Sequence, residues 1–259
     1  MTTILTINSA AGSAGKSATA AALAAILGEQ GQRVVVVDLD AQGTVTDWLG
    51  VDGTTATHTT GDVLLRRVSL NEALMDTQVP GVRLLPANRS VDESLVRLAN
   101  ETGGEQRLRL ALAGIDADVV LIDTPGAIGL AAVTALVAAT HVLTVTMPTL
   151  KEARGIDEIR STAAAVAEAY NPGLAFVGIV PCAVPLGNSG GRLYADVMAG
   201  LADTYGPLLG PAVRRTTRVP ESHAHGAPIV LHDPAGGASA DYRAVVAWLQ
   251  DAKVLPQAR

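Results

Sequence analysis

The sequence predicts an α/β protein with a doubly wound, mostly parallel sheet flanked by helices. Two observations predict this fold class. Short apolar, β-branched runs alternate along the chain with stretches of helical length, and the runs are apolar almost throughout, as strands buried on both faces must be. The chain has 259 residues, 48% of them hydrophobic, which is enough to bury a large core. We therefore expect one domain over residues 1–259, with ligands bound beyond the carboxyl ends of the strands.

Four runs are strong strand candidates and two are weaker. The strong runs are TILTIN (3–8), RVVVVDLD (33–40), DVVLID (118–123) and HVLTVTM (141–147), and the weaker ones are VRLLPA (82–87) and AFVGIV (175–180). The helical stretches are 16–29, 92–98, 105–113, 130–138, 152–169, 193–205 and 242–251. The Gly/Pro-rich stretches 186–191 and 232–239 are expected to be loops. Because the first run begins at residue 3, we expect no N-terminal helix-turn-helix.

Composition narrows the class of protein. The single cysteine excludes an internal disulfide and a cysteine-ligated iron–sulfur cluster within one subunit. The net charge of −6 argues against a protein that is basic all over. We expect no secretion signal, because no basic stretch and cleavable apolar segment come before the first run, and no apolar run approaches the roughly 18 residues of a membrane span. The stretch 241–259 has too few basic residues for a membrane-surface helix. We expect a cytoplasmic protein that does not bind membranes.

Zinc binding and thiol chemistry are not expected. His223 and His225 form a His-x-His pair, but no Cys, Asp or third His lies at ligand spacing. Cys182 has no Lys, Arg or His beside it in the sequence that would favour a thiolate. The sequence therefore predicts a packing role for this cysteine.

The stretch SAAGSAGKSATA, residues 9–20, predicts a phosphate-binding loop. It follows a strand and opens a helix, which is the context that gives a GKS tripeptide its meaning. Gly12 and Gly15 let the backbone N–H groups turn inward, Lys16 supplies a charge for the β- and γ-phosphates, and Ser17 is the expected Mg²⁺ ligand. The expected nucleotide-contacting residues are Gly12, Ser13, Ala14, Gly15, Lys16, Ser17 and Ala18. Ala10 replaces the first glycine of the pattern, which a negative φ would allow. The alternative is an ordinary glycine-rich turn with an exposed lysine.

Aspartates end two of the strand candidates. Asp38 closes the second run, Asp40 lies just beyond it, and Asp123 closes a later run before Thr-Pro-Gly. An apolar run that ends in Asp is how phosphate-loop enzymes hold Mg²⁺, directly or through water. Each aspartate could instead cap a helix. Together with the GKS tripeptide, they favour a metal site at Ser17, Asp38 and Asp123.

The order of these motifs resembles the ParA/MinD family of deviant-Walker ATPases, and ParA in particular. The resemblance rests on GKS, DLDAQGTVTDWLG, DVVLIDTPGAIGLAAVTALVAATHVLTVTMP, GIVPCAVP and RRTTRVPESHAHGAPI, and runs from residue 3 to about 230. The last block matches the family segment Pro-Arg-x-x-Arg-x-x-Glu-x-x-x-x-Gly-x-Pro-Ile. The matching positions are Arg215, Arg218, Glu221, Gly226, Pro228 and Ile229.

The resemblance implies a mechanism and partners. It implies that Lys16 contacts the phosphates of ATP, that Asp38 and Asp123 surround Mg²⁺, and that Asp40 orients the attacking water. It also implies that Pro181, Cys182 and Arg214 enclose the adenine. ParA-like proteins are ATP-dependent homodimers that bind DNA without sequence preference and are released when an adaptor stimulates hydrolysis. The resemblance thus implies self-association, duplex DNA, a ParB-like adaptor and a nucleoid-associated ATP state.

One position departs from the family. The family loop carries a signature lysine that crosses the dimer interface to the partner's nucleotide, and Ala11 occupies that position here. The McdA group, which positions carboxysomes, is similar in this respect and carries a lysine in a later region. We therefore expect Lys151 to take over the contact in trans, as a catalytic residue. The alternative is a solvated lysine at the start of a helix.

An arginine cluster is the expected DNA-binding surface. Arg214, Arg215 and Arg218 have no acidic residue between them, and Arg192 could add to them. Exposed arginines neutralise phosphates without reading bases. The alternative is an ion-paired surface segment.

Three other functions remain open from the sequence. One is positioning of carboxysomes or another protein cargo through an McdB-like adaptor. A second is a metabolic enzyme of the dethiobiotin synthetase kind, against which the arginine cluster argues. The third is a non-hydrolysing nucleotide switch, suggested by Ala11, against which the retained Asp40 argues. The cargo, the adaptor and the rate of hydrolysis lie outside the sequence.

Overall fold

The computed structural model describes residues 2–12, 14–126 and 129–259. Within them, seven strands form one sheet in the order β3-β4-β2-β5-β1-β6-β7. All neighbouring strands are parallel except β3, which runs antiparallel to β4. The strands are β1 (Thr3–Asn8), β2 (Val34–Asp38), β3 (Met75–Asp76), β4 (Val82–Leu85), β5 (Val119–Asp123), β6 (His141–Thr146) and β7 (Ala175–Pro181). The predicted doubly wound, mostly parallel sheet is confirmed.

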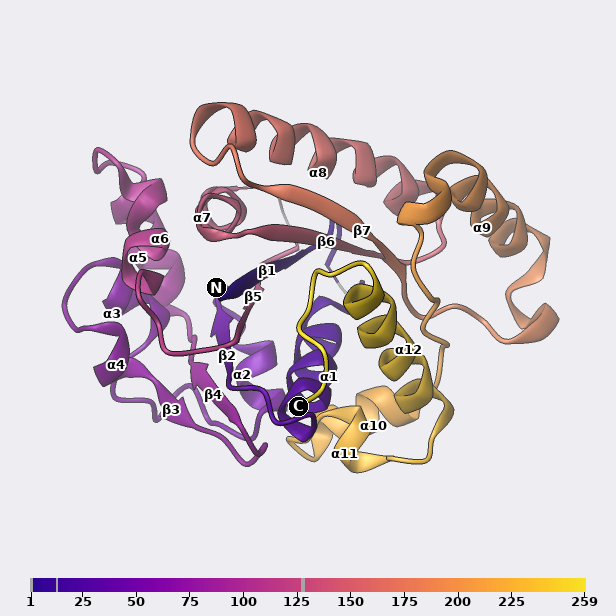
Figure 1. The fold of residues 1–259 in the computed structure, drawn as a ribbon, viewed down its shortest axis with the longest axis horizontal. Helices are drawn as coiled ribbons and strands as arrows, with labels where there is room; N and C mark the ends of the chain where they lie inside the picture. The colour runs from indigo at the N-terminus through magenta and orange to yellow at the C-terminus, as the bar shows by residue number, and fades with distance from the viewer. Residues whose placement is uncertain (1, 13, 127–128) are drawn as a thin grey trace.

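Helices cover both faces of this sheet (Figure 1). One layer contains α1 (Lys16–Glu29), α2 (Thr44–Trp48), α10 (Arg218–Ala224), α11 (Ile229–His232) and α12 (Gly237–Asp251). The other layer contains α3 (Thr60–Leu64), α4 (Leu70–Ala73), α5 (Ser90–Leu98), α6 (Arg107–Leu112), α7 (Leu130–Ala138) and α8 (Leu150–Ala169), with α9 (Gly191–Tyr205) packed at the end of α8. Short 3-10 turns are η1 (Gly104–Gln106), η2 (Gly187–Gly190) and η3 (Gly206–Leu208).

The central strands are buried on both faces, which explains their continuous apolar runs. In β2, Val34 and Val36 face the core beneath α1, whereas Val35 and Val37 face the core beneath α6 and α7. Successive strand side chains point to opposite faces, so a strand between two helical layers needs an apolar residue at every position. β2 supplies this with four consecutive valines.

Several short helices differ from the sequence expectations. The elements α2, α3, α4, α10 and α11 span four to seven residues each, which is too short to show a helical period. The loop expected at 232–239 is wrong in its second half, because α12 begins at Gly237. The buried Ser239 hydroxyl donates to the backbone oxygens of Ile229 and Asp233, so contacts with α11 fix this helix start. Similarly, 186–191 contains η2 and the first residue of α9.

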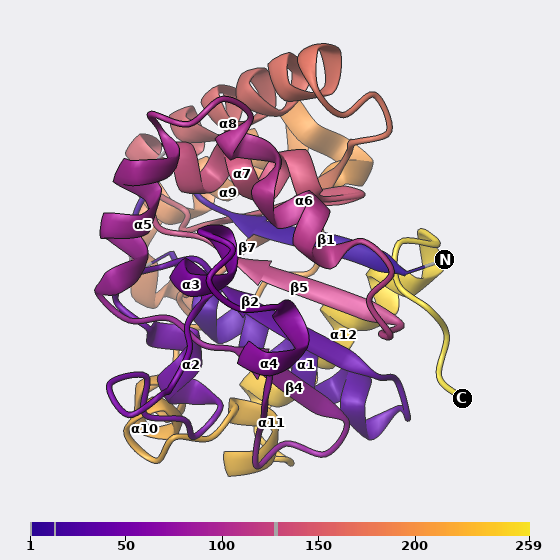
Figure 2. The same ribbon diagram turned by 90° about the vertical axis from the view of Figure 1, so that its left-hand side faces the viewer.

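The two ends of the described chain lie at the amino edge of the sheet, away from the carboxyl ends of β1, β2 and β5 (Figure 2). Thr3 Oγ1 donates to Val254 O at 3.3 Å, and Arg259 N donates to Gln30 O at 3.1 Å. The carboxyl edge is thereby left to the loops that carry the predicted motifs. Among the described residues, no helix combines the length and hydropathy needed to cross a membrane.

Candidate functional site

The phosphate loop joins the end of β1 to the start of α1. Gly15 caps α1 with a φ of 93°, a conformation that favours glycine, and a Cβ there would lie 3.3 Å from Cys182 Cβ. Ala10 does not have a positive φ, so an L residue fits where the pattern asks for glycine. The predicted contact at Ser13 lies outside the described residues.

The Lys16 side chain folds over this loop. It is 6% exposed, and its Nζ donates to Ser9 Oγ at 2.9 Å and to Ala11 O at 3.3 Å. Burial lowers the pKa of Lys16, while the nearby carboxylates of Asp123 and Asp40 oppose the shift. An ammonium group held over a loop at a helix N-terminus is suited to a bound polyanion.

Two other segments pack directly on the phosphate loop. A Cβ at Gly126, in the Thr-Pro-Gly turn after β5, would lie 2.6 Å from Gly12 N. A Cβ at Gly155, on α8, would overlap Ala10 Cβ. The loop is therefore confined by the segments that follow β5 and β6, and neither glycine has room for a side chain.

The predicted carboxylates meet at the carboxyl edge of the sheet. Asp38 and Asp123 are paired neighbours of β2 and β5, and both are fully buried. Asp38 Oδ1 accepts from Asp40 N at 3.0 Å, and its Oδ2 accepts from Thr46 N and Oγ1 at 3.2 and 2.6 Å. Burial and the charge of Asp123 raise the pKa of Asp38 well above its usual value, against these hydrogen bonds.

Asp123 has the features of a cation ligand. Within the described part of the chain, neither of its buried carboxylate oxygens has a hydrogen-bond partner of normal geometry, although such partners are usual for buried polar groups. Burial raises the pKa of Asp123 to about 7, against the lowering effects of Ser17 and Lys16. A cation would satisfy both oxygens. One hydroxyl and a pair of carboxylates suit Mg²⁺, which keeps several waters.

A cavity of about 320 Å³ opens beside the phosphate loop. Of the predicted nucleotide residues, Ala14, Gly15, Ala18, Cys182 and Arg214 line it. Pro181 is not among the lining residues, and its backbone oxygen accepts from Val213 N at 2.7 Å.

The sequence reasoning did not identify the far wall of this cavity. Trp48, Arg215, His223 and Tyr242 line it. Trp48, Arg215 and His223 belong to quoted motif blocks and Tyr242 does not, and nothing in the local pattern indicates that α2, α10 and α12 meet there.

Cys182 is packed rather than activated. Its Sγ lies 3.8 Å from Thr19 Oγ1, and burial raises its pKa to about 12. His223 and His225 each stack on another ring, Trp48 and His232 respectively. Cys182 is therefore part of the packing beneath the phosphate loop, and the two histidines form ring contacts.

The arginine cluster is less free than its sequence suggests. Arg214 pairs with Asp241 through Nε and Nη2 at 2.6 and 2.7 Å. Arg218 pairs with Glu221 and with Asp233. Glu221 lies three residues after Arg218 on α10, whereas Asp233 and Asp241 come from segments later in the chain.

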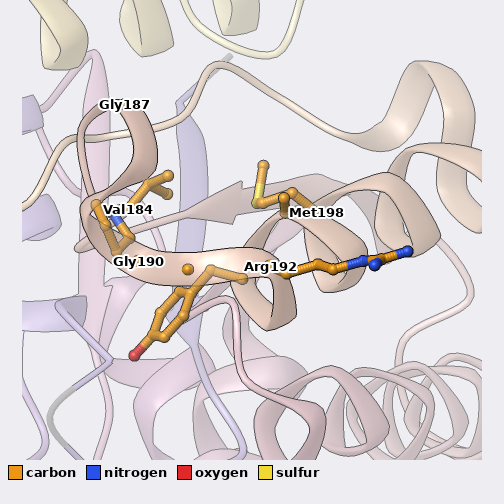
Figure 3. Close-up of a pocket in the computed structure, with 9 residues that line it drawn as sticks. Val184, Gly187, Gly190, Arg192 and Met198 are labelled. Atoms are coloured by element: carbon orange, nitrogen blue, oxygen red, sulfur yellow. The ribbon is translucent and has the colours of Figure 1, made fainter.

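Two of the predicted arginines remain available. Arg215 is exposed and forms no ion pair among the described residues. The Arg192 side chain is 94% exposed, and its ion pair with Asp196 is long, with Nε 3.9 Å from Oδ2. It points away from Val184 at the start of α9 (Figure 3). The DNA-binding role of the four arginines stays a prediction.

Lys151 lies on the first turn of α8, the helix that packs on Ala10 through Gly155. It is exposed, and Thr149 caps the helix by accepting from Glu152 N at 3.3 Å. The lysine is therefore at the nucleotide edge, and its role in trans stays a prediction.

Several known proteins are similar to this chain in sequence and architecture. The family model described as an AAA domain matches residues 1–176. The chromosome partitioning protein ParA of Caulobacter vibrioides is 30% identical over 235 residues, covering 89% of this chain and 87% of the relative.

Solved structures agree with the fold. One described as cobyrinic acid a,c-diamide synthase from Mycobacterium smegmatis, with bound ADP and magnesium, is 30% identical with a TM-score of 0.84, covering 100% of this chain and 98% of that chain. An ATP complex of a McdA variant from Cyanothece has a TM-score of 0.87 over 99% and 98% of the two chains, and its 18% identity supports the fold alone. The family match, the ParA relative and the phosphate-loop geometry agree, and the chain belongs to the ParA/MinD family of P-loop ATPases.

Proposed function

We propose that this protein forms ATP-dependent homodimers, binds duplex DNA without sequence preference, and positions or segregates a plasmid or chromosome. A ParB-like adaptor stimulates hydrolysis and releases the protein from DNA. The observation that carries the proposal is the meeting of Lys16, Asp38 and Asp123 around a loop at the start of a buried helix. Such an edge can hold a polyphosphate and a cation side by side.

ATP and Mg²⁺ are the cofactors of this proposal. The backbone from Gly12 to Ala18 cradles the phosphates, and Lys16 neutralises them. Ser17, Asp38 and Asp123 would hold Mg²⁺, directly or through water, and the ion would screen the charge that develops on the phosphates. The orphaned oxygens of Asp123 support this assignment. The cavity beside Gly15 accommodates the base.

Hydrolysis is the transfer of the γ-phosphoryl group to water, which yields ADP and inorganic phosphate. Asp40 lies just beyond β2, where its Oδ1 accepts from Gln42 N at 3.0 Å. In the proposal it orients the attacking water. The rate is low until DNA and the adaptor are present.

The dimer places Lys151 on the partner's nucleotide, which replaces the lysine missing at Ala11. The exposed first turn of α8, packed on the phosphate loop, supports this role. Lys151→Ala should abolish ATP-dependent dimers in light scattering, whereas Lys253→Ala, an exposed lysine at the amino edge, should retain them. If both variants dimerise with ATP, Lys151 is a solvated lysine.

DNA binding rests on Arg215 and Arg192, with Arg214 and Arg218 holding the segment in place through their ion pairs. Two copies of this surface in a dimer would bind more tightly through avidity. In the cell, the ATP form is expected in the cytoplasm on the nucleoid.

The first test is binding of the purified protein to a random duplex with ATP, with ADP and without nucleotide, at two salt concentrations. We expect binding only with ATP, weakening steeply as salt rises. Arg215→Ala should weaken binding and reduce the salt slope by about 1, while Arg97→Ala, an exposed arginine on α5 in the other helical layer, should not. Absence of DNA binding in every nucleotide state would overturn this part of the proposal.

A metabolic enzyme is the second candidate. It is favoured by the similarity to the Mycobacterium smegmatis structure that is described as a cobyrinic acid a,c-diamide synthase. It predicts nucleotide-dependent chemistry on a small-molecule acceptor and no affinity for DNA. The only cysteine is buried with a pKa of about 12, so the chain offers no thiolate nucleophile for releasing nitrogen from an amide donor. The DNA assay separates the two candidates.

A McdA-like role, with an McdB-like adaptor and a protein cargo, predicts the same DNA binding and differs only in the adaptor and the cargo.

A further inference from the structure

Trp48 lies where three parts of the molecule meet. Its side chain is buried and lines the cavity beside the phosphate loop. Its indole Nε1 donates to Ser222 Oγ on α10 at 3.2 Å, and its ring lies against His223 with the centroids 4.5 Å apart. Trp48 is also the last residue of α2, the helix that follows the carboxylates of β2.

The position of α2 is tied to the buried carboxylate of Asp38. Thr46, two residues before Trp48, donates to Asp38 Oδ2 through both its N and its Oγ1. A five-residue helix has little stability of its own, so its placement follows its tertiary contacts. A change at the Asp38 carboxylate therefore reaches Trp48 through a short and rigid connection.

The far end of α2 packs against the turn after α10. Gly50 and Gly226 face each other with φ values of 75° and 59°. A Cβ at Gly50 would lie 3.3 Å from Gly226 O, and a Cβ at Gly226 would lie 3.4 Å from Asp47 O. This close approach, together with the Trp48 contacts, joins α2 and α10 at two points.

The helix α10 carries one end of the cationic segment 214–218. Arg218 is its first residue, and Arg218 N donates to Thr216 Oγ1 at 3.2 Å. Arg215 is exposed just before the helix and lines the same cavity as Trp48. A displacement of α10 consequently changes where the segment presents its charges.

We propose that Trp48 is a positioning residue that transmits occupancy of the nucleotide site to α10 and so sets the placement of the cationic segment. The inference rests on the nucleotide site of the proposed function. The hydrogen bond from Trp48 to Ser222 is the specific link, because Ser222 is fully buried and lies outside the cavity.

Hydrogen exchange measured by mass spectrometry tests this link without DNA. Peptides covering 213–226 and 15–29 are compared in the full-length protein with and without ATP and Mg²⁺. In the wild type, we expect ATP to slow exchange in both regions, by about fivefold or more in α10, the lower end of typical coupling between sites. In Ser222→Ala, the response of 15–29 should persist while that of α10 falls below about twofold.

Two controls separate a specific link from general destabilisation. Ser94→Ala removes another buried hydroxyl, which donates to Ser90 O on α5, and should leave the α10 response intact. Trp48→Phe keeps a ring but removes the N–H donor, and should reproduce the loss seen in Ser222→Ala. Trp248→Phe, at the sequence's only other tryptophan, should behave like the wild type. It also leaves Trp48 as the sole tryptophan, whose fluorescence on excitation at a wavelength that tyrosine does not absorb should change on ATP binding.

The outcomes are distinguishable. If ATP slows hydrogen exchange in residues 15–29 of the wild type but not in α10, the inference is wrong and the nucleotide site stands. The same conclusion follows if ATP slows exchange in α10 equally in the wild type, Ser222→Ala and Trp48→Phe. If neither region of the wild type responds, the nucleotide site fails, and the inference fails with it. Failure of DNA binding alone leaves this experiment unaffected.

Discussion

The thiol of Cys182 lies beneath the last glycine of the phosphate loop, against Gly15 and Thr19. Burial raises its pKa from 9.0 to about 12. At pH 8 the group is therefore a thiol and not the thiolate that reacts with alkylating agents. We expect iodoacetamide to leave the native protein unmodified over an hour at pH 8. In urea the same protein should gain one adduct, detected by intact mass. Native alkylation at the rate of a free thiol would contradict this packing.

Individual site residues differed in how far the sequence could place them. Asp38 and Asp123 were predictable because each ends a strand, and parallel strands end at one edge of the sheet. Lys16 was predictable because the glycine-bearing loop after β1 places it at the start of α1. The pairing of Arg214 with Asp241 was not predictable, because the two residues lie 27 positions apart and meet only when α12 packs against α1 and α11. Trp48 lies in one of the family-like motifs, but its hydrogen bond to Ser222 joins residues that are 174 positions apart in the sequence, so no local pattern predicts it.

At the scale of elements, the contact between α8 and the phosphate loop gives a sharp test. Alanine in place of a helix-interior glycine usually stabilises a protein by about 0.5–1 kcal/mol. Gly155→Ala should instead destabilise by about 1–3 kcal/mol, because its Cβ overlaps Ala10 and overpacking carries that cost. ATP affinity should fall as the loop shifts. Urea unfolding and calorimetry measure the two effects.

Gly200→Ala is the matched control on α9, where a Cβ would meet nothing within 4 Å. It should show the ordinary stabilisation and unchanged ATP affinity. Equal stabilisation of both variants would mean that α8 does not confine the loop.

The elements recovered from the sequence were the long ones. The bounds of α1 and α7 agree with the predicted stretches, since each is a continuous apolar helix between defined strands. The short helices were missed because tertiary contacts, and not periodicity, hold them. Two of them carried a readable signal: capping boxes at Thr59 and Asp62 for α3, and at Ser69 and Glu72 for α4.

At the scale of the whole molecule, an ion-pair network ties together segments that are distant in sequence. Asp118 accepts from Arg33 N and Nη2 at 2.8 and 2.9 Å, and Arg259 Nη2 lies 2.8 Å from Asp118 Oδ1. These contacts join the starts of β2 and β5 to the last residue. They lower the pKa of Asp118 to about 2, chiefly through the Arg33 side chain.

This network predicts a pH-dependent contribution to stability. A carboxyl whose folded pKa is depressed stabilises the fold above its unfolded pKa of about 3.8 and loses that effect as pH falls towards 2. Asp118→Asn should therefore destabilise by about 1 kcal/mol at pH 7, after discounting for solvent screening. The difference from the wild type should shrink below about pH 4. Urea unfolding at pH 7, 4 and 3 measures it, with Asp203→Asn, at an exposed aspartate with no ion pair among the described residues, as the matched control.

The sheet order also bears on how the chain is made. The first strand, β1, pairs only with β5 and β6 in the described sheet, and β6 ends at Thr146. At a synthesis rate of about 5–20 residues per second, β1 waits roughly 7 to 28 seconds on the ribosome before both neighbours exist. β1 has no partner until β5 is complete at Asp123, and the phosphate loop is not confined on its other side until α8 is made. A nascent chain without these segments lacks a complete nucleotide site, so ATP cannot assist the first stages of folding.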